Sequence, residues 1–226
     1  MTWQPTSNDV AYRHARQNMT ELLTGVAGIA VRRVPACPEW TVGDLVRHLV
    51  QVCGFVLGRF GRDTADFPAD AGDLPSLLVQ WRRAGQQVEE LLSGGDDRAT
   101  EKLIADVFTH ELDLRQALEV PPPAEHPAYP AAFSFAVRGI TSVARMLDLP
   151  PLELVTDGRS WRVGDGEPVG AVEAGWYDLY RSLAGRRTHG QIRALCWSVD
   201  PAPWLPVFTW GPFTPPPHPV EHVVTG

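Results

Sequence analysis

The sequence predicts an α+β protein in which an antiparallel helical bundle is followed by a small α+β domain. Residues 1–150 contain long stretches in which apolar side chains recur at helical spacing. Residues 151–226 contain shorter runs that alternate polar with apolar side chains and end in turn dipeptides. Pro150 and Pro151 separate the two patterns, so we predict one domain over 1–150 and a second over 151–226.

The first two helices are predicted from their capping signals. An Asn-Asp pair at the start of residues 8–29 can cap a first helix over that range. Residues 34–40 then read as a turn punctuated by prolines. Thr41 and Asp44 have the spacing of a capping box, which predicts a second helix over residues 41–60.

Three further helices complete the predicted bundle. Residues 61–72 read as a polar loop, and residues 73–93 as a helix that ends at a pair of glycines. A fourth helix over 97–120 is stopped by three consecutive prolines, and a fifth, apolar helix covers 130–147. Long amphipathic helices with short connections are typical of an antiparallel bundle.

The C-terminal part is predicted to mix strands with one helix. Residues 152–156 and 160–163 alternate around an Asp-Gly turn dipeptide, which is typical of a hairpin. Residues 171–184 read as a helix and residues 191–197 as a strand. The proline-rich tail, residues 212–226, is predicted to be loose.

Composition excludes several classes of protein. The 226 residues are 44% apolar and 21% charged, which does not suit a disordered chain or a disulfide-stapled miniprotein. The net charge of −7 argues against binding to a nucleic-acid backbone. No apolar stretch is long enough to cross a membrane, and no export signal opens the chain, so we expect a cytoplasmic protein.

The three cysteines are predicted to play a passive role. Cys37, Cys53 and Cys196 stand far apart, their number is odd, and no CxxC pair occurs. This pattern argues against a disulfide framework and against a zinc site made of cysteines alone. We expect reduced thiols that act as small core hydrophobes.

Two histidines lie at or beside apolar helix faces and are candidate metal ligands. Asp106 and His110 stand four residues apart on one predicted helix, so their side chains share a face. His48, from the second helix, would complete a set of two imidazoles and a carboxylate, which leaves coordination positions open for substrate. The alternative is that both histidines are structural partners of nearby carboxylates. The other histidines are predicted to have solvated or structural roles: His14, His126, His189, His218 and His222.

Several segments together resemble a known family. Residues 37–49 read CPEWTVGDLVRHL and are similar to the CPGWTVRDLVAHL signature of the mycothiol-dependent maleylpyruvate isomerase family. Residues 107–118, VFTHELDLRQAL, resemble the family's HxxDIRRAL segment. The C-terminal segments 161–166, 183–187 and 191–197 resemble its second domain. The motifs occur in the family's order along nearly the whole chain.

The resemblance implies a fold and a ligand set. The fold is a metal-binding four-helix bundle of the DinB-like superfamily plus an extra helix, followed by a C-terminal domain similar to sterol-carrier folds. The family's metal ligands correspond here to His48, Asp106 and His110. The acidic ligand is a glutamate in the family's well-known member, so the shorter Asp106 places the metal nearer the helix or needs a bridging water. Asp113 is the alternative carboxylate ligand. We expect it rather to orient His110 or to pair with Arg115.

The resemblance also implies thiol chemistry. A divalent cation would bind the sulfur of mycothiol and hold it as a thiolate. We expect Zn²⁺, with Ni²⁺ or another metal as the alternative. The thiolate attacks a small electrophile such as a maleylpyruvate-like diacid. The thiol then leaves after isomerisation, or stays attached in an S-transfer. Arginines would clamp such a diacid, and we consider Arg82, Arg83, Arg186 and Arg187 without placing any in the site.

Two other interpretations stay open. The same metal and fold could serve another thiol or a specialised biosynthetic reaction, because a fold does not fix a substrate. Alternatively, the protein is a non-catalytic small-molecule binder. In each case we expect a monomer or homodimer with small-molecule partners, and neither nucleic acid nor a membrane.

Overall fold

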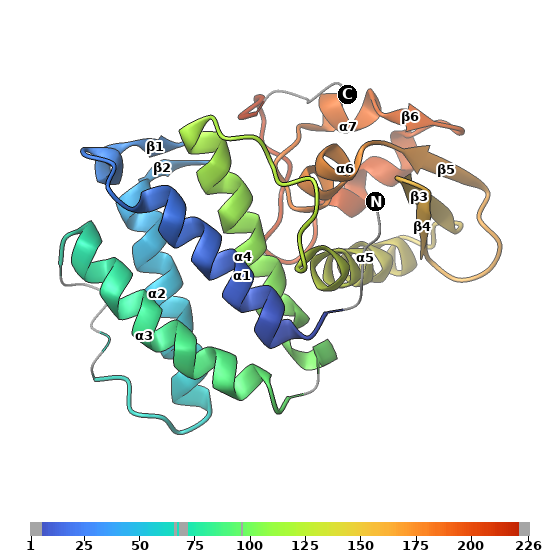
Figure 1. Ribbon diagram of the computed structural model, residues 1–226. Coiled ribbons are helices and arrows are strands. Elements are labelled where there is room, and N and C mark those ends of the chain that lie inside the picture. The colour runs from blue at the N-terminus through green and yellow to red at the C-terminus, as the bar shows by residue number, and fades with distance from the viewer. Residues whose placement is uncertain (1–5, 66, 68–71, 96, 222–226) are drawn as a thin grey trace. The chain divides into compact units, whose positions relative to one another are not determined.

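The structure, a computed structural model, describes residues 6–65, 67, 72–95 and 97–221. Its contacts divide the chain between Ala132 and Phe133 into two compact units. A helical region precedes a mixed four-stranded sheet with helices, so the predicted α+β class is confirmed (Figure 1). Helix α5 (Tyr129–Met146) begins in one unit and continues into the other. The predicted domain limits, 1–150 and 151–226, stay a prediction.

Four helices build the first unit: α1 (Asn8–Leu23), α2 (Val42–Arg59), α3 (Leu74–Leu92) and α4 (Asp97–Leu118). Helix α2 packs against α3, and α1 packs against both α3 and α4 (Figure 1). Their facing sides bury large apolar side chains, among them Met19, Leu45, Trp81 and Phe108. Burying each such side chain contributes about 1.5–3 kcal/mol to folding. The predicted second, third and fourth helices are confirmed.

Helix α1 ends six residues earlier than predicted, at Leu23 rather than near Ile29. Two glycines explain the difference, because Gly25 and Gly28 have φ angles of +77° and +72°. This left-handed conformation is favourable for glycine and ends a right-handed helix. Only a short 3₁₀ turn, Ile29–Val31, follows before the chain extends.

The predicted turn at residues 34–40 is a small β-hairpin. Strand β1 (Arg33–Val34) pairs antiparallel with β2 (Cys37–Thr41). Thr41 then caps α2: its hydroxyl accepts the Asp44 N–H at 3.2 Å, and the Asp44 carboxylate accepts the Thr41 N–H at 2.9 Å. The predicted capping box is therefore present, and it fixes the hairpin to the start of α2.

The second unit contains a sheet with strand order β4-β3-β5-β6. Strand β3 (Leu152–Thr156) pairs antiparallel with β4 (Arg159–Val163) and parallel with β5 (Gly170–Glu173). Asp157 and Gly158 join the first two strands, and both have positive φ angles, as a tight hairpin turn requires. The predicted hairpin is confirmed.

Two predictions for the second unit were wrong in part. The predicted helix 171–184 begins only at α6 (Trp176–Leu183), because its first residues pair with the sheet as β5. The predicted strand 191–197 is mostly helix α7 (His189–Arg193) and shortens to β6 (Cys196–Trp197). A second capping box explains α7, because Thr188 and Gln191 exchange side-chain-to-backbone hydrogen bonds at 3.1 and 2.9 Å.

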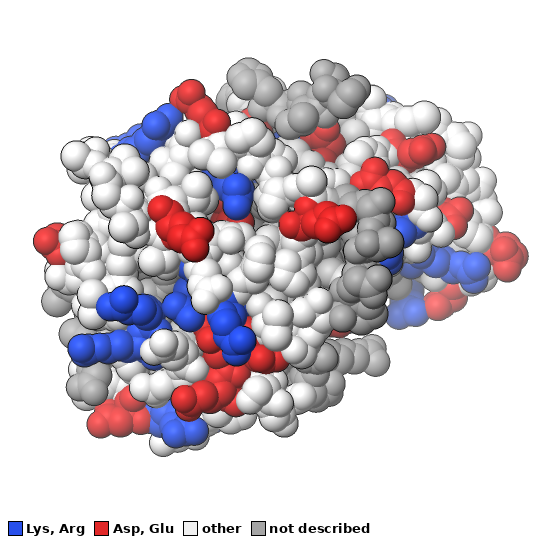
Figure 2. Space-filling model, viewed as in Figure 1, with Lys and Arg blue, Asp and Glu red and all other residues white. Residues whose placement is uncertain are grey.

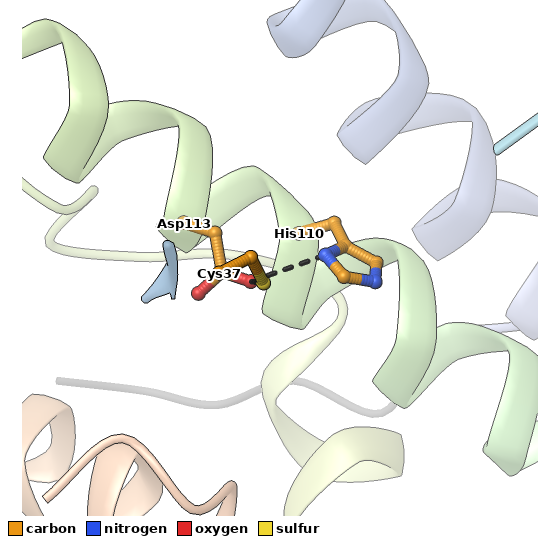
Figure 3. Close-up of side chains that lie close together, drawn as sticks. All are labelled: Cys37, His110 and Asp113. Carbon is orange, nitrogen blue, oxygen red and sulfur yellow. Dashed lines mark hydrogen bonds and ion pairs between the residues drawn. The ribbon is translucent and has the colours of Figure 1, made fainter. Parts of the chain in front are cut away.

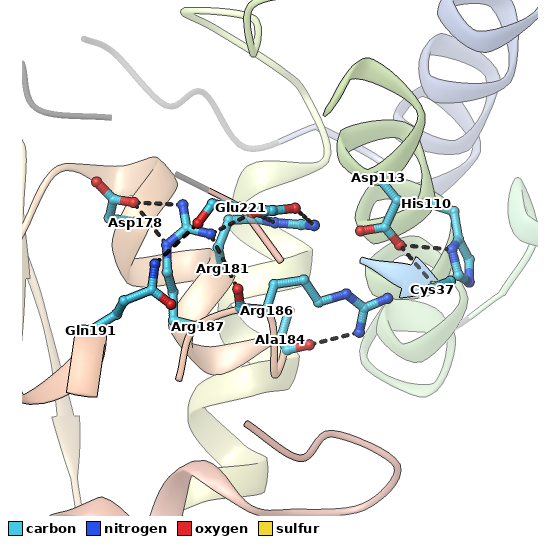
Figure 4. Close-up of polar contacts among 10 residues, drawn as sticks. All are labelled: Cys37, His110, Asp113, Asp178, Arg181, Ala184, Arg186, Arg187, Gln191 and Glu221. Atoms are coloured by element: carbon cyan, nitrogen blue, oxygen red, sulfur yellow. Dashed lines mark hydrogen bonds and ion pairs between the residues drawn. The ribbon is translucent and has the colours of Figure 1, made fainter. Parts of the chain in front are cut away.

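The tail is anchored at its last described residue, which the prediction of a loose tail did not anticipate. Glu221 is buried and forms ion pairs with Arg181 and Arg187 (Figure 4). Arg187 also donates to Asp178 at 2.7 Å, so two buried arginines face two buried carboxylates. Buried charges are tolerated when they are paired in this way. Residues 222–226, including His222, lie outside the described residues.

Two surface properties agree with the composition. Within the described residues, no helix is long and apolar enough to cross a membrane. On the face drawn in Figure 2, acidic and basic side chains lie among one another.

The capping box gives a first prediction. Thr41→Ala removes a hydroxyl that caps α2, so we expect the free energy of unfolding to fall by about 1 kcal/mol. Hydrogen bonds from Thr41 hold the pKa of Asp44 below its usual value. In the unfolded chain the pKa of Asp44 is about 3.9, and in the folded protein it is lower. The stability lost in Thr41→Ala should therefore decrease as the pH falls below about 3.9 and through the folded-state pKa, because Asp44 becomes protonated. Chemical denaturation across pH measures this. Asp73→Ala, at the cap of α3, is the matched control and should also destabilise the protein at pH 7. Equal stability of Thr41→Ala and the wild type would contradict the prediction.

The ion cluster gives a second prediction. Glu221→Gln leaves Arg181 and Arg187 buried beside an uncharged group, so the free energy of unfolding should fall by about 3–5 kcal/mol. Asp165→Asn breaks the exposed pair with Arg145 and should leave the free energy of unfolding almost unchanged, because solvent screens exposed ion pairs. Urea denaturation compares the two, and equal midpoints would show that the cluster does not hold the tail.

Candidate metal centre

The three predicted ligands come together between two helices. His48 lies on α2, and Asp106 and His110 lie one turn apart on α4. Asp106 Oδ1 is 3.6 Å from His48 Nε2 and 3.9 Å from His110 Nε2. Ligand atoms from all three side chains lie within 4.8 Å of one another. The structure thus brings these residues together, while their binding of a metal stays a prediction.

The geometry of this group fits a cation. Two ligand atoms bound to one tetrahedral zinc at about 2.1 Å lie about 3.4 Å apart, close to the separations from Asp106 Oδ1. His48 Nε2 and Asp106 Oδ2 are both buried, and neither has a hydrogen-bond partner among the described residues. Unsatisfied buried polar atoms are costly, and a bound cation would satisfy both.

Asp106 is suited to be the anionic member of the group. Burial raises the pKa of its carboxyl, but the neighbouring His48 and His110 rings outweigh burial and hold this pKa below its usual value. Asp106 is therefore ionised at neutral pH and offers a full negative charge. Imidazoles bind a metal in their neutral form, so as a ligand set the group would carry a charge of about −1.

Asp113 lies on the other side of the His110 ring. Its Oδ2 is 3.1 Å from His110 Nδ1, and its side chain is completely buried (Figure 3). An ionised carboxylate only accepts hydrogen bonds, so His110 Nδ1 donates and Nε2 keeps its lone pair. Asp113 thus orients His110 toward Asp106, the role predicted for it in preference to ligation.

Trp40 is part of the site and was not predicted from the sequence. Its ring centroid lies 5.0 Å from that of His48 and 5.7 Å from that of His110. Trp40 belongs to β2, and the Thr41 capping box holds this strand at the start of α2. The indole therefore forms an apolar wall against both imidazoles. Its place inside segment 37–49 was the one sequence signal for it.

One side of the group lies nearer to solvent than the other. The side chains of His48 and Asp106 are 28% and 30% exposed, whereas those of His110 and Asp113 are 9% and 0% exposed. A small molecule would therefore approach the group from the His48 and Asp106 side. The Asp113 side is closed by protein.

A second polar cluster lies on α4 beside the candidate ligands. Glu111 accepts hydrogen bonds from Arg115 Nε at 2.8 Å and Asn18 Nδ2 at 3.1 Å, and His126 Nε2 lies 3.0 Å from it. Burial raises the pKa of Glu111, but His126 and Arg115 outweigh it and keep the pKa low. His126 is buried, and its Nδ1 accepts the Ala128 N–H, so its role is structural, one of the two roles predicted.

The candidate arginines have different surroundings. Arg82 and Arg83 are exposed on α3. Arg187 is buried in the ion cluster with Asp178 and Glu221, and Arg186 is half-buried and donates to the Ala184 carbonyl at 2.8 Å. Arg187 therefore already neutralises carboxylates of this chain.

The cysteine prediction holds for one residue of three. Cys53 is buried, its sulfur lies 3.0 Å from the Tyr12 hydroxyl, and burial raises its pKa to about 12. Cys53 is thus an inert thiol. Cys37 is half-buried and Cys196 is exposed, so the prediction of core hydrophobes was wrong for both. Cys37 starts β2, and Cys196 lies on the short edge strand β6.

Comparison with known proteins indicates a family. A family model described as the mycothiol maleylpyruvate isomerase N-terminal domain matches residues 12–149. No curated protein and no solved structure matches the chain. The matched range contains His48, Asp106 and His110. Residues 150–226 lie outside it, so their likeness to sterol-carrier folds stays a prediction.

The Asp113 contact gives a third prediction. Asp113→Asn keeps the shape of the side chain but removes the charge that orients His110. We expect Zn²⁺ affinity to fall by about 10–100-fold, the usual effect of losing such a partner. Competition with a chelating dye measures the affinity. Asp63→Asn, on an exposed loop of the same unit, is the control and should change nothing. Unchanged affinity of Asp113→Asn would contradict the assigned role.

Proposed function

The chain belongs to the mycothiol maleylpyruvate isomerase N-terminal domain family, and on that premise we propose that it is a divalent-metal-dependent enzyme that uses a low-molecular-weight thiol. The thiol is mycothiol, and the reaction is isomerisation of, or S-transfer to, a small electrophile. The observation that carries this proposal is the convergence of His48, Asp106 and His110, in which two buried atoms, His48 Nε2 and Asp106 Oδ2, have no hydrogen-bond partner among the described residues.

The residues fit a catalytic rather than a purely structural cation. Three protein ligands with one exposed side leave a coordination position open, as catalytic zinc sites do. A divalent cation held there would favour the thiolate form of a bound thiol near neutral pH. The ligand charge of about −1 would leave a net charge of about +1, which favours an anionic sulfur.

The surrounding side chains would prepare the site for that chemistry. Asp113 fixes the His110 tautomer, so that no proton shift is needed when a cation binds. The Trp40 ring excludes water from one flank of both imidazoles, which strengthens electrostatic interactions there. Cys53, with its raised pKa, does not compete as a nucleophile. The reactive sulfur would therefore arrive with the thiol.

The metal is the first test of this proposal. We expect untagged wild-type protein to bind about one equivalent of Zn²⁺ or Ni²⁺ through three protein ligands, as catalytic zinc sites do. Measured in a Cys37→Ser background, so that the thiol near His110 cannot hold the ion, His48→Ala and His110→Ala should each weaken that binding by more than about 100-fold, since even indirect partners are worth 10–100-fold. His218→Ala removes an exposed histidine of the tail and should bind normally. Elemental analysis and isothermal titration measure both. Normal binding by both ligand variants would overturn the site.

The thiol is the second part of the same test. Zinc-loaded protein should accelerate adduct formation between mycothiol and a bimane electrophile, and chelation or His48→Ala should abolish the acceleration. Zinc binding without any acceleration would overturn the proposed thiol chemistry and leave the metal site standing. The absence of metal binding would instead indicate a non-catalytic binding protein.

A further inference from the structure

We propose that Cys37, His110 and Asp113 form a second cation site, on the opposite ring nitrogen of His110, which binds a thiophilic divalent ion in competition with the first (Figure 3). This site goes beyond the proposed function, because Cys37 takes no part in the thiol reaction. We call it the Cys37 site, and the group of His48, Asp106 and His110 the open site.

The ligand atoms of the Cys37 site are already close together. Cys37 Sγ lies 3.9 Å from Asp113 Oδ2, and this oxygen lies 3.1 Å from His110 Nδ1. Ligand atoms from all three residues lie within 4.8 Å of one another. Cys37 owes its position to the hairpin, because β1 packs against α4 and Val34 pairs with Cys37.

The chemistry of the Cys37 site differs from that of the open site. A thiolate, an imidazole nitrogen and a carboxylate together form a soft, mixed ligand set that suits Zn²⁺ or Cd²⁺. Thiolate and carboxylate carry about −2, which neutralises a divalent ion completely. Asp113 is fully buried, His110 nearly so and Cys37 half-buried, so an ion here would have little exposure to solvent.

The two sites exclude each other through His110. A neutral imidazole has one nitrogen with a lone pair, and the other carries hydrogen. When Asp113 accepts the Nδ1 hydrogen, Nε2 is available to the open site. An ion on Nδ1 displaces that hydrogen, and the neutral ring then carries its hydrogen on Nε2, facing Asp106. Filling the Cys37 site would therefore remove a ligand from the open site.

The test uses Co²⁺ as the probe in a variant that lacks the open site. His48→Ala/Asp106→Ala keeps all three residues of the Cys37 site. We expect it to bind Co²⁺ with a sulfur-to-metal charge-transfer band in the near ultraviolet. Adding Cys37→Ser, a change of one atom, should abolish the band and weaken Co²⁺ binding by more than about 100-fold. Adding Cys196→Ser, which removes the exposed thiol, is the matched control and should leave the band unchanged.

Each outcome decides the proposal. The absence of Co²⁺ binding in the double variant, binding without a sulfur band, or a band that survives Cys37→Ser would each overturn the Cys37 site. Circular dichroism confirms that each variant is folded. Failure of the proposed function is distinguishable, because Cys37→Ser leaves only the open site, and Zn²⁺ binding to that variant depends on His48.

Discussion

The hydrogen bond between His110 and Asp113 is the interaction on which the rest of the site depends. Both residues lie on α4, three positions apart, so the helix itself sets their 3.1 Å contact. The buried carboxylate fixes which nitrogen of His110 carries hydrogen and points the other toward Asp106. Without this hydrogen bond, the His110 ring could turn or change tautomer. Its Nε2 would then no longer be held toward Asp106 and His48.

The second constraint is the anchored hairpin before α2. The Thr41–Asp44 capping box fixes where α2 begins, and therefore where His48 faces α4. The same anchor positions the two hairpin residues that flank the His110 ring, Trp40 and Cys37. One local motif of four residues thus places three side chains of the site. Segment 37–49, which resembles the family signature, therefore contains the capping box together with the three side chains that it places.

Local signals explain which features could be predicted from the sequence. Capping residues, glycine pairs and proline runs are read along the chain, so α2, α3 and α4 and the i,i+4 pair of Asp106 and His110 were predicted. The packing of His48 against that pair followed only from the family resemblance and helical spacing. Contacts between distant segments leave no such signal. The burial of Glu221 by two arginines and the stacking of Trp40 therefore appeared only in the structure.

The two candidate sites, one at each ring nitrogen of His110, differ in the charge of their ligands. The chain as a whole carries −7, so its long-range field repels an anionic thiolate. A divalent ion in the open site would reverse the sign locally, because one carboxylate and two imidazoles leave about +1. In the proposed Cys37 site, a thiolate and a carboxylate leave no charge to attract a second sulfur. Cys37 thus supplies from within the protein the kind of ligand that the open site must receive from solution. In this proposal, the ring nitrogen of His110 that carries hydrogen decides whether the ion binds the thiol from solution or the thiolate of Cys37.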